Sequence, residues 1–178
     1  VRVHERLDFE PHLAAMKGKT VAVDPERAVA AIFDALETAG AKIVQRRDPA
    51  VLPKAMKNEA EIAGHKAAQA RDGAALTRFL HWLSIEAPKG GLTEMSAAAR
   101  LEQFRRECGD LRDLSFDTIS GAGPNGAICH YRVTEESSRP ITLNSLYLVD
   151  SGGQYPDGTT DVTRTVAVGE PTAEMRDR

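Results

Sequence analysis

The chain has 178 residues, of which 28% are charged and 42% hydrophobic, and its formal net charge is -3. That length allows one ordinary domain, or one domain and part of another. Its Lys and Arg residues are scattered, which argues against the basic footprint of a nucleic-acid-binding protein. No apolar run approaches the roughly 20 residues needed to cross a bilayer. We therefore expect a soluble protein with neither membrane nor nucleic-acid partners.

The cysteines and the first residues bear on the cellular compartment. Cys108 and Cys129 are the two cysteines, and their spacing is not the Cys-x-x-Cys pattern of metal or redox sites. Val1 to Leu7 contains no apolar signal-peptide core and no initiator methionine. Free cysteines without an export signal are typical of a reducing compartment, so we expect a cytoplasmic location.

The first 54 residues show a β-α-β pattern. Asp24 and Pro25 are typical of a helix start, and Gly40 of a helix end. The expected elements are a strand at 20–23, a helix at 26–38 and a strand at 41–44. A polar segment with two prolines follows, which predicts a domain boundary near residue 55.

Two helices are expected to open the second domain. Asn58 and Glu61 have the spacing of a capping box, and the helix after them should run to about Ser84. Gly90 and Gly91 interrupt the chain before Thr93 begins the second helix. We expect Phe79 and Trp82 in the core. His65 and His81 are 16 positions apart, too far to share a metal, and are interpreted as surface or packing residues.

From Leu114 onward the pattern changes to that of strands. The expected strands are 116–119, 127–133, 146–149 and 162–168. Helices followed by an antiparallel sheet predict the α+β class. A further helix start is indicated at Glu170–Glu174, close to the last residue.

Two aspartates bracket the glycine-rich turn between the last two strands. Asp150 leaves one strand and Asp161 enters the next, so antiparallel pairing should place their Cβ atoms roughly 5 Å apart. Carboxylates that close repel each other unless a cation lies between them. A pair of metal ions bridged by a shared carboxylate fits this spacing. Asp157, in the turn itself, is interpreted as a turn former. The Thr163 hydroxyl is interpreted as a hydrogen-bond partner of a metal-binding carboxylate.

Glycines 121, 123 and 126 have the spacing of a dinucleotide-binding fingerprint. That fingerprint must open a helix, whereas Pro124 and the β-rich residues 127–133 predict a hairpin. We therefore reject dinucleotide binding. His130 falls on the predicted strand of this hairpin.

The string from Asp150 to Thr165, Asp-Ser-Gly-Gly-Gln-Tyr-Pro-Asp-Gly-Thr-Thr-Asp-Val-Thr-Arg-Thr, resembles the metal-binding hairpin of the Xaa-Pro aminopeptidases (aminopeptidase P). These are pita-bread metallopeptidases, and the closest resemblance is to their long, three-domain type. The segment Gly121–Tyr131 resembles the family segment that ends in a substrate-pocket histidine, and Lys57–Trp82 resembles the first helix of the catalytic domain. Together the similarities cover roughly residues 55 to 178.

The resemblance implies a site and an activity. Asp150 and Asp161 would bind two divalent metals, with Asp161 bridging them, and His130 would contact the substrate. Mn²⁺ suits carboxylate ligands best, with Zn²⁺ or Co²⁺ as alternatives. The implied reaction releases the first residue from peptides with proline in second position, by attack of a water bound to both metals. Peptides that begin Xaa-Pro are the implied partners, and a homodimer of the whole protein is possible.

The family also has a histidine and two glutamates as metal ligands, beyond the last residue here. We therefore interpret the chain as an internal fragment that is inactive alone. Residues 1–54 would end a creatinase-like second domain, and 55–178 would be the first half of the pita-bread domain. Two alternatives stay open: an Xaa-Pro dipeptidase (prolidase), and a non-catalytic pita-bread domain that binds peptides or proteins.

Overall fold

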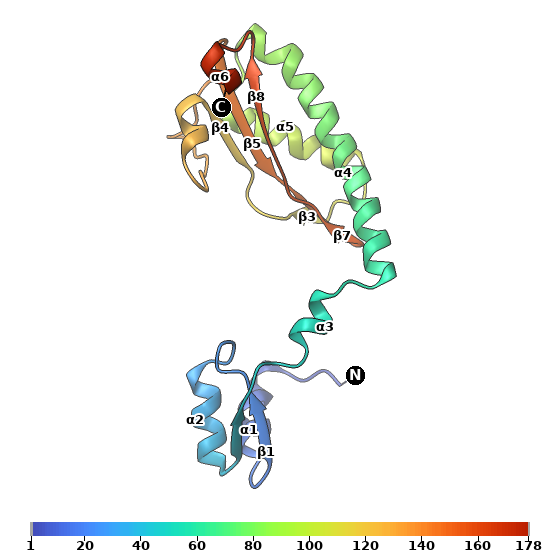
Figure 1. Ribbon diagram of the computed structural model, residues 1–178, viewed down its shortest axis with the longest axis vertical. Coiled ribbons are helices and arrows are strands. Elements are labelled where there is room, and N and C mark those ends of the chain that lie inside the picture. The colour runs from blue at the N-terminus through green and yellow to red at the C-terminus, as the bar shows by residue number, and fades with distance from the viewer. Residues whose placement is uncertain (1, 178) are drawn as a thin grey trace. The chain divides into compact units, whose positions relative to one another are not determined.

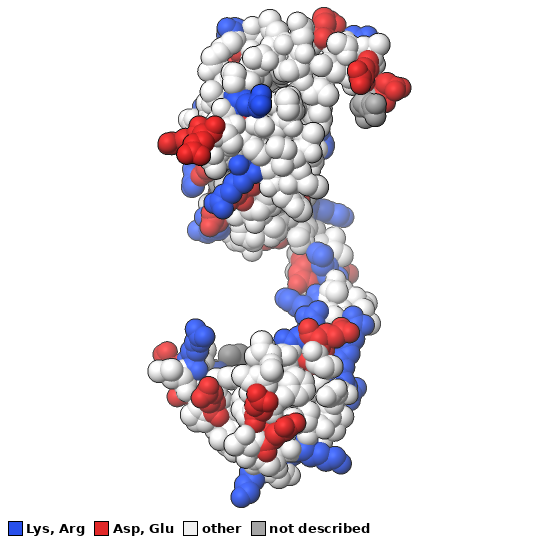
Figure 2. All heavy atoms as spheres, turned by 90° about the vertical axis from the view of Figure 1, so that its left-hand side faces the viewer, with Lys and Arg blue, Asp and Glu red and all other residues white. Residues whose placement is uncertain are grey.

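The structure is a computed structural model that describes residues 2–177. The chain forms two compact units, Val1–Lys57 and Asn58–Arg178, called unit 1 and unit 2. The division lies three residues after the expected boundary of 54 and 55. On the face that Figure 2 shows, Lys and Arg side chains lie among Asp and Glu side chains.

Unit 1 is built around two parallel strands, β1 (Thr20–Val23) and β2 (Lys42–Gln45) (Figure 1). Its helical segments are η1 (Arg6–Asp8), α1 (Phe9–Ala14), α2 (Ala30–Ala39) and α3 (Val51–Ala55). Helix α2 ends as predicted, with Gly40 in the left-handed conformation at φ 74°.

The predicted start of α2 is wrong by four residues. Asp24 does not cap the helix. Its carboxylate accepts hydrogen bonds from the backbone N–H groups of Glu26 (2.9 Å) and Asp48 (2.8 Å). These bonds form a turn that ties the end of β1 to the segment after β2, and the helix begins only at Ala30.

Two helices form one layer of unit 2. Helix α4 (Glu59–Glu86) begins with the predicted capping box, in which Asn58 and Glu61 bond each other's backbone N–H groups. After the short helix η2 (Ala87–Lys89), helix α5 (Glu94–Glu107) starts with a second capping box, between Thr93 and Ser96. A short helix, α6 (Ala173–Asp177), follows the last strand where the acidic pattern predicted one.

Two antiparallel sheets complete unit 2 (Figure 1). The larger has the order β4-β5-β8, and the smaller the order β3-β6-β7. The strands are β3 (Asp113–Leu114), β4 (Ile119–Ala122), β5 (Ser145–Ser151), β6 (Gly153–Tyr155), β7 (Gly158–Thr159) and β8 (Val162–Val168). Helices and antiparallel sheet confirm the α+β prediction.

The core of unit 2 lies between the two long helices and the larger sheet. Its centre includes Phe79, Leu101, Tyr147 and Val149, each fully buried. Trp82 is partly buried and packs against this core. His81 is exposed, and His65 is half-buried where α4 meets Gly158.

The strand predicted at 127–133 is absent, and this expectation was wrong. The chain instead forms a short helix, η3 (Gly123–Ala127), and then turns, so residues 123–139 make a loop that we call the His130 loop. A Cβ atom on Gly121 would lie 2.8 Å from the Gly126 backbone, so the glycines allow the chain to fold back tightly. The predicted strand at 116–119 is also displaced, because β4 begins only at Ile119.

Candidate metal centre

The Asp150–Asp161 hairpin (residues 145–168) forms through the ladder between β5 and β8. In this register Asp150 lies opposite Thr163, and Ser151 lies opposite Val162. Asp161 therefore precedes Asp150's partner by two positions. The expected direct opposition of the two aspartates is wrong: they are diagonal neighbours, a relationship in which Cα atoms are typically about 7–8 Å apart.

The register has a local cause in the turn. The hairpin tip is not loose, because β6 and β7 form a second ladder around Pro156 and Asp157. A Cβ atom on Gly152 would lie 1.8 Å from the carbonyl oxygen of Thr160, so only glycine permits the two arms to approach this closely. Thr160 is fully buried, and its hydroxyl accepts a hydrogen bond from the N–H of Gly153 at 2.8 Å.

One cleft, with a volume of about 410 Å³, brings together all three residues singled out in the sequence. Asp150 comes from β5, Asp161 from the residue before β8, and His130 from the His130 loop. The lining residues are Phe116, Asp117, Ile119, His130, Tyr131, Arg132, Asp150 and Asp161. The lining combines aromatic and aliphatic side chains with carboxylates, and a mainly apolar pocket with a few polar groups is typical of a ligand site.

The environment of Asp150 fits a bound cation. Its Oδ1 atom is buried, and within residues 2–177 no hydrogen-bond donor reaches it. A buried carboxylate oxygen without a partner is costly, and such atoms mark sites where an ion or water belongs. Thr163 lies directly opposite but does not donate to this oxygen, so the role expected for its hydroxyl is not realised there.

The chemistry of the donors is that of hard oxygen ligands. Asp150 and Asp161 together offer four carboxylate oxygens, a set that suits Mn²⁺ and similar divalent ions. Across residues 2–177, however, no three His, Cys, Asp or Glu side chains gather as a complete metal-binding group. Two carboxylates alone would be only part of a metal's ligand set, so a closed metal site here would need further donors.

His130 has an unusual backbone conformation. It is exposed and lies in the left-handed region at φ 52°. A non-glycine residue in this region is uncommon, and such conformations cost of order 1–3 kcal/mol unless the surroundings hold them. Strained positions of this kind cluster at ligand-binding sites. His130 lies in a turn and not on a strand, so no strand pairing fixes its position.

A buried ion pair anchors the hairpin to the helix layer. Arg105 donates to the Asp72 carboxylate from Nε at 2.7 Å and from Nη2 at 3.2 Å, and both side chains are almost fully buried. Tyr155 donates its hydroxyl proton to the same carboxylate at 2.8 Å. Arg105 also donates to the hydroxyl of Ser151, the residue directly after Asp150.

This cluster affects both ionisation and geometry. Burial raises the pKa of the Tyr155 hydroxyl, and its hydrogen bond to Asp72 raises it further. Tyr155 therefore stays protonated and acts as a fixed donor. Contacts at Ser151 and Tyr155 hold the two sides of Gly152 and Gly153, which fixes the start of the hairpin tip.

The chain is similar over much of its length to known aminopeptidases. Residues 63–178 match the model of metallopeptidase family M24. The chain belongs to metallopeptidase family M24. It is 44% identical over 160 residues to Xaa-Pro aminopeptidase 1 of Dictyostelium discoideum, covering 88% of this chain and 25% of that protein. It is 45% identical over 135 residues to Xaa-Pro aminopeptidase 2 of Rattus norvegicus, covering 76% of this chain and 20% of that one.

A solved structure shows the same fold. X-prolyl aminopeptidase from Caenorhabditis elegans, described as a cytosolic enzyme with a di-nuclear active site, superposes with a TM-score of 0.85 at 32% identity. The match covers 98% of this chain and 29% of that chain. The resemblance to Xaa-Pro aminopeptidases is thus confirmed, and this M24 chain spans a fifth to a quarter of the length of these curated relatives.

Several features of this M24 cleft were missed by the sequence reasoning. Asp117 and Arg132 line the cleft and form an ion pair at 3.0 Å, although both side chains are largely exposed. No spacing rule connects residues on different turns, so no sequence signal indicated this pair. Asp72 and Arg105 were missed because isolated charges on helices are usually solvated.

No helix within residues 2–177 has the length and apolar character of a membrane span.

Proposed function

We propose that this M24 chain carries the first part of the active site of an Xaa-Pro aminopeptidase, which releases the residue before proline from the N-terminus of peptides. The similarity to proteins named Xaa-Pro aminopeptidases, at 44% and 45% identity, supports the substrate class. The single structural observation that carries the proposal is the buried, unpartnered Oδ1 of Asp150 in a cleft shared with Asp161 and His130.

Asp150 and Asp161 are the proposed metal ligands, and the family resemblance implies that Asp161 would serve both ions. Their carboxylates favour Mn²⁺, with Zn²⁺ or Co²⁺ as alternatives. When bound, such a pair supplies an activated water nucleophile and polarises the scissile carbonyl. The two carboxylates would contribute the negative charge that holds the ions.

His130 is proposed to act on the substrate. It is exposed on the cleft wall, so its ring can reach a peptide lying there. A neutral imidazole donates a hydrogen bond, and a donor directed at the carbonyl oxygen becomes more effective as that oxygen gains negative charge. Phe116 and Ile119 provide the apolar wall against which the peptide would lie.

The remaining ligands are proposed to come from the rest of a longer protein, because the chain spans only a fifth to a quarter of the length of its relatives. In this proposal unit 2 is the first half of the pita-bread catalytic domain and unit 1 is the end of a creatinase-like domain. With two carboxylate ligands the chain alone should bind Mn²⁺ weakly and have no peptidase activity. A cytoplasmic location is part of the proposal, as the C. elegans relative is described as cytosolic.

The test uses the protein extended to the length of its relatives, called the full-length protein below. It should release Arg from Arg-Pro-Pro with Mn²⁺ present, and should lose this activity on chelation. Cleavage of the dipeptide Arg-Pro but not of Arg-Pro-Pro would instead indicate an Xaa-Pro dipeptidase. Metal-loaded protein that cleaves neither peptide would contradict the proposed function and favour a binding domain.

A further inference from the structure

Glu94 is a fully buried carboxylate outside the cleft, and the proposed chemistry does not use it. It is the first residue of α5. Acidic residues in a first helical turn are usually exposed, where they interact favourably with the N-terminal N–H groups. Burial of this one is costly unless donors surround it. None of the ion pairs within residues 2–177 includes Glu94, so hydrogen bonds must hold its charge.

Four groups donate to this carboxylate, and all come from the His130 loop or its edge. Oε1 accepts from the N–H of Ala122 at 2.7 Å and from Asn125 Nδ2 at 3.0 Å. Oε2 accepts from the Tyr131 hydroxyl at 2.8 Å and from the N–H of Arg139 at 3.0 Å. One side chain therefore binds the beginning, the middle and the end of the loop.

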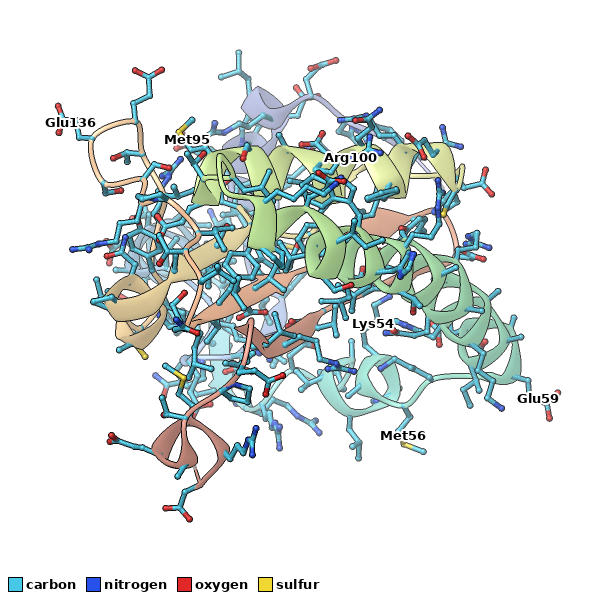
Figure 3. The ribbon with its side chains drawn as sticks, turned by 90° about the horizontal axis from the view of Figure 1, so that it is seen from above. Lys54, Met56, Glu59, Met95, Arg100 and Glu136 are labelled. Atoms are coloured by element: carbon cyan, nitrogen blue, oxygen red, sulfur yellow. The ribbon has the colours of Figure 1, made fainter. Side chains whose placement is uncertain are left out.

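The backbone around Glu94 strengthens the same connection. The N–H of Glu94 donates to the carbonyl of Arg139 at 3.0 Å, and its carbonyl accepts from the Ser120 hydroxyl at 2.7 Å. In Figure 3 the loop around Glu136 lies next to the start of α5, where Met95 is labelled. The N–H of Met95 correspondingly donates to the Ser138 hydroxyl at 3.4 Å.

Tyr131 connects this cluster to the cleft. It follows His130 directly, lines the cleft, and is buried with its hydroxyl on Glu94. Burial raises the pKa of Tyr131, so it stays a proton donor to the carboxylate. Tyr131 is thus fixed to Glu94 directly beside His130, which has a φ of 52° and lines the cleft.

We propose that Glu94 is the positioning residue of His130: its carboxylate closes the His130 loop and so fixes the histidine at the substrate cleft. The proposal rests on the proposed function for its effect on turnover, although the tether itself does not depend on it. Glu94 touches no substrate, and all its influence passes through the loop.

The variant Glu94→Gln tests this tether with the least change in shape. An amide has one accepting oxygen, and its NH₂ group must face one of the donors. The Tyr131 hydroxyl can rotate and accept a hydrogen bond from this NH₂ group. The backbone N–H groups of Ala122 and Arg139 can only donate, so one of them loses its acceptor and one end of the loop is released. Misplacement of a catalytic group by about 1 Å can cost on the order of 100-fold in rate. We expect Glu94→Gln to lower turnover about 10- to 100-fold, with little change in the KM for Arg-Pro-Pro.

A double-mutant cycle in the full-length protein separates positioning from general stability. If Glu94 acts through His130, adding Glu94→Gln to His130→Ala should lower turnover no further. Asp72→Asn is the matched control, because Asp72 is an equally buried carboxylate that contacts the hairpin and not the loop. In the double variant with His130→Ala, the fold-losses in turnover from Asp72→Asn and His130→Ala should multiply. If the fold-losses from Glu94→Gln and His130→Ala also multiply, the proposal is overturned.

Hydrogen exchange gives a readout that needs no activity. In Glu94→Gln the amides of residues 125–139 should exchange faster, while those of α4 and β5 stay as slow as in wild type. Uniform acceleration across unit 2 would show a merely structural residue and contradict the tether, as would an unchanged loop. If wild-type protein cleaves no Xaa-Pro peptide but the loop alone is released, the proposed function fails and the tether stands.

Discussion

The Asp150–Asp161 hairpin and the His130 loop supply the same cleft but obtain their shapes differently. The hairpin is a ladder of neighbouring strands, with glycines where the arms approach most closely. The His130 loop has no ladder, and its conformation depends on Glu94, a residue 28 positions before Ala122. Local pattern therefore determines one side of the cleft, and a remote buried group determines the other.

The two sides also differ in how their buried charge is compensated. Behind the hairpin, Asp72 is paired with Arg105 as well as with Tyr155. Behind the loop, Glu94 is held by neutral donors alone within the part of the chain that the structure describes. Removal of a charge should therefore have different consequences on the two sides, and the variants below are arranged to reveal this difference.

The largest effect is expected at Asp161. Asp161→Asn in the full-length protein should lower turnover by several orders of magnitude, because one substitution removes charge from both proposed metal positions. Asp157→Asn is the control. It lies in the same hairpin, but its ion pair with Arg71 is partly exposed, and it should keep near-normal turnover. Turnover of Asp161→Asn close to wild type would rule out the ligand assignment.

The next largest effect is on stability, at the anchor of the hairpin. Asp72→Ala leaves the buried Arg105 without its partner, which typically costs about 3–5 kcal/mol of unfolding free energy. Glu102→Ala breaks an exposed pair with Arg106 on α5 and should cost at most about 0.5 kcal/mol. Urea denaturation of the two variants measures both values. Similar small losses would mean that the buried pair does not anchor the hairpin.

His130→Ala should reduce activity far more than stability. Loss of a hydrogen bond to the developing oxyanion typically costs about 3 kcal/mol, or roughly 100-fold in turnover. The exposed ring makes none of the core contacts, so the melting temperature should stay near that of wild type. The opposite pattern, with a lower melting temperature and normal turnover per folded molecule, would identify a packing residue.

The smallest effect concerns alkaline pH. Burial raises the pKa of Tyr131 on the loop side and of Tyr155 on the hairpin side above the unfolded value of about 10. The folded state keeps these protons longer than the unfolded state, so the stabilisation is complete below about pH 10 and is lost as pH rises through the folded pKa values. Urea midpoints measured from pH 8 to 11 should stay level up to about pH 10 and then fall, and the fall should be smaller in Tyr155→Phe. A urea midpoint that rises with pH would contradict the raised pKa values of Tyr131 and Tyr155.

Sequence alone could predict much of the hairpin side. The capping box at Asn58 and the glycines before Thr93 marked the two helix starts, and the strand pattern after Leu114 marked β5 and β8. It could not give the register, because a shift of two residues keeps every side chain on the same face and leaves the pattern unchanged. Asp150 was therefore placed opposite Asp161 instead of Thr163.

The His130 loop could not be predicted, for a different reason. Residues 127–133 are rich in strand-forming side chains, but Asn125 and Tyr131 bond Glu94, and these tertiary contacts override the local preference. In the sequence, Glu94 is an acidic residue at a helix start, where such residues are common and usually exposed. Only the fold shows that α5 begins beneath the loop, which buries that carboxylate.

The central claim is that Asp150 and Asp161 hold a pair of metal ions. Anomalous diffraction from crystals of the full-length protein grown with Mn²⁺ tests it most directly. The account predicts two anomalous peaks in the cleft, one in contact with Asp150 and both in contact with Asp161. Fully loaded, active protein whose metal peaks lie away from both carboxylates would contradict it.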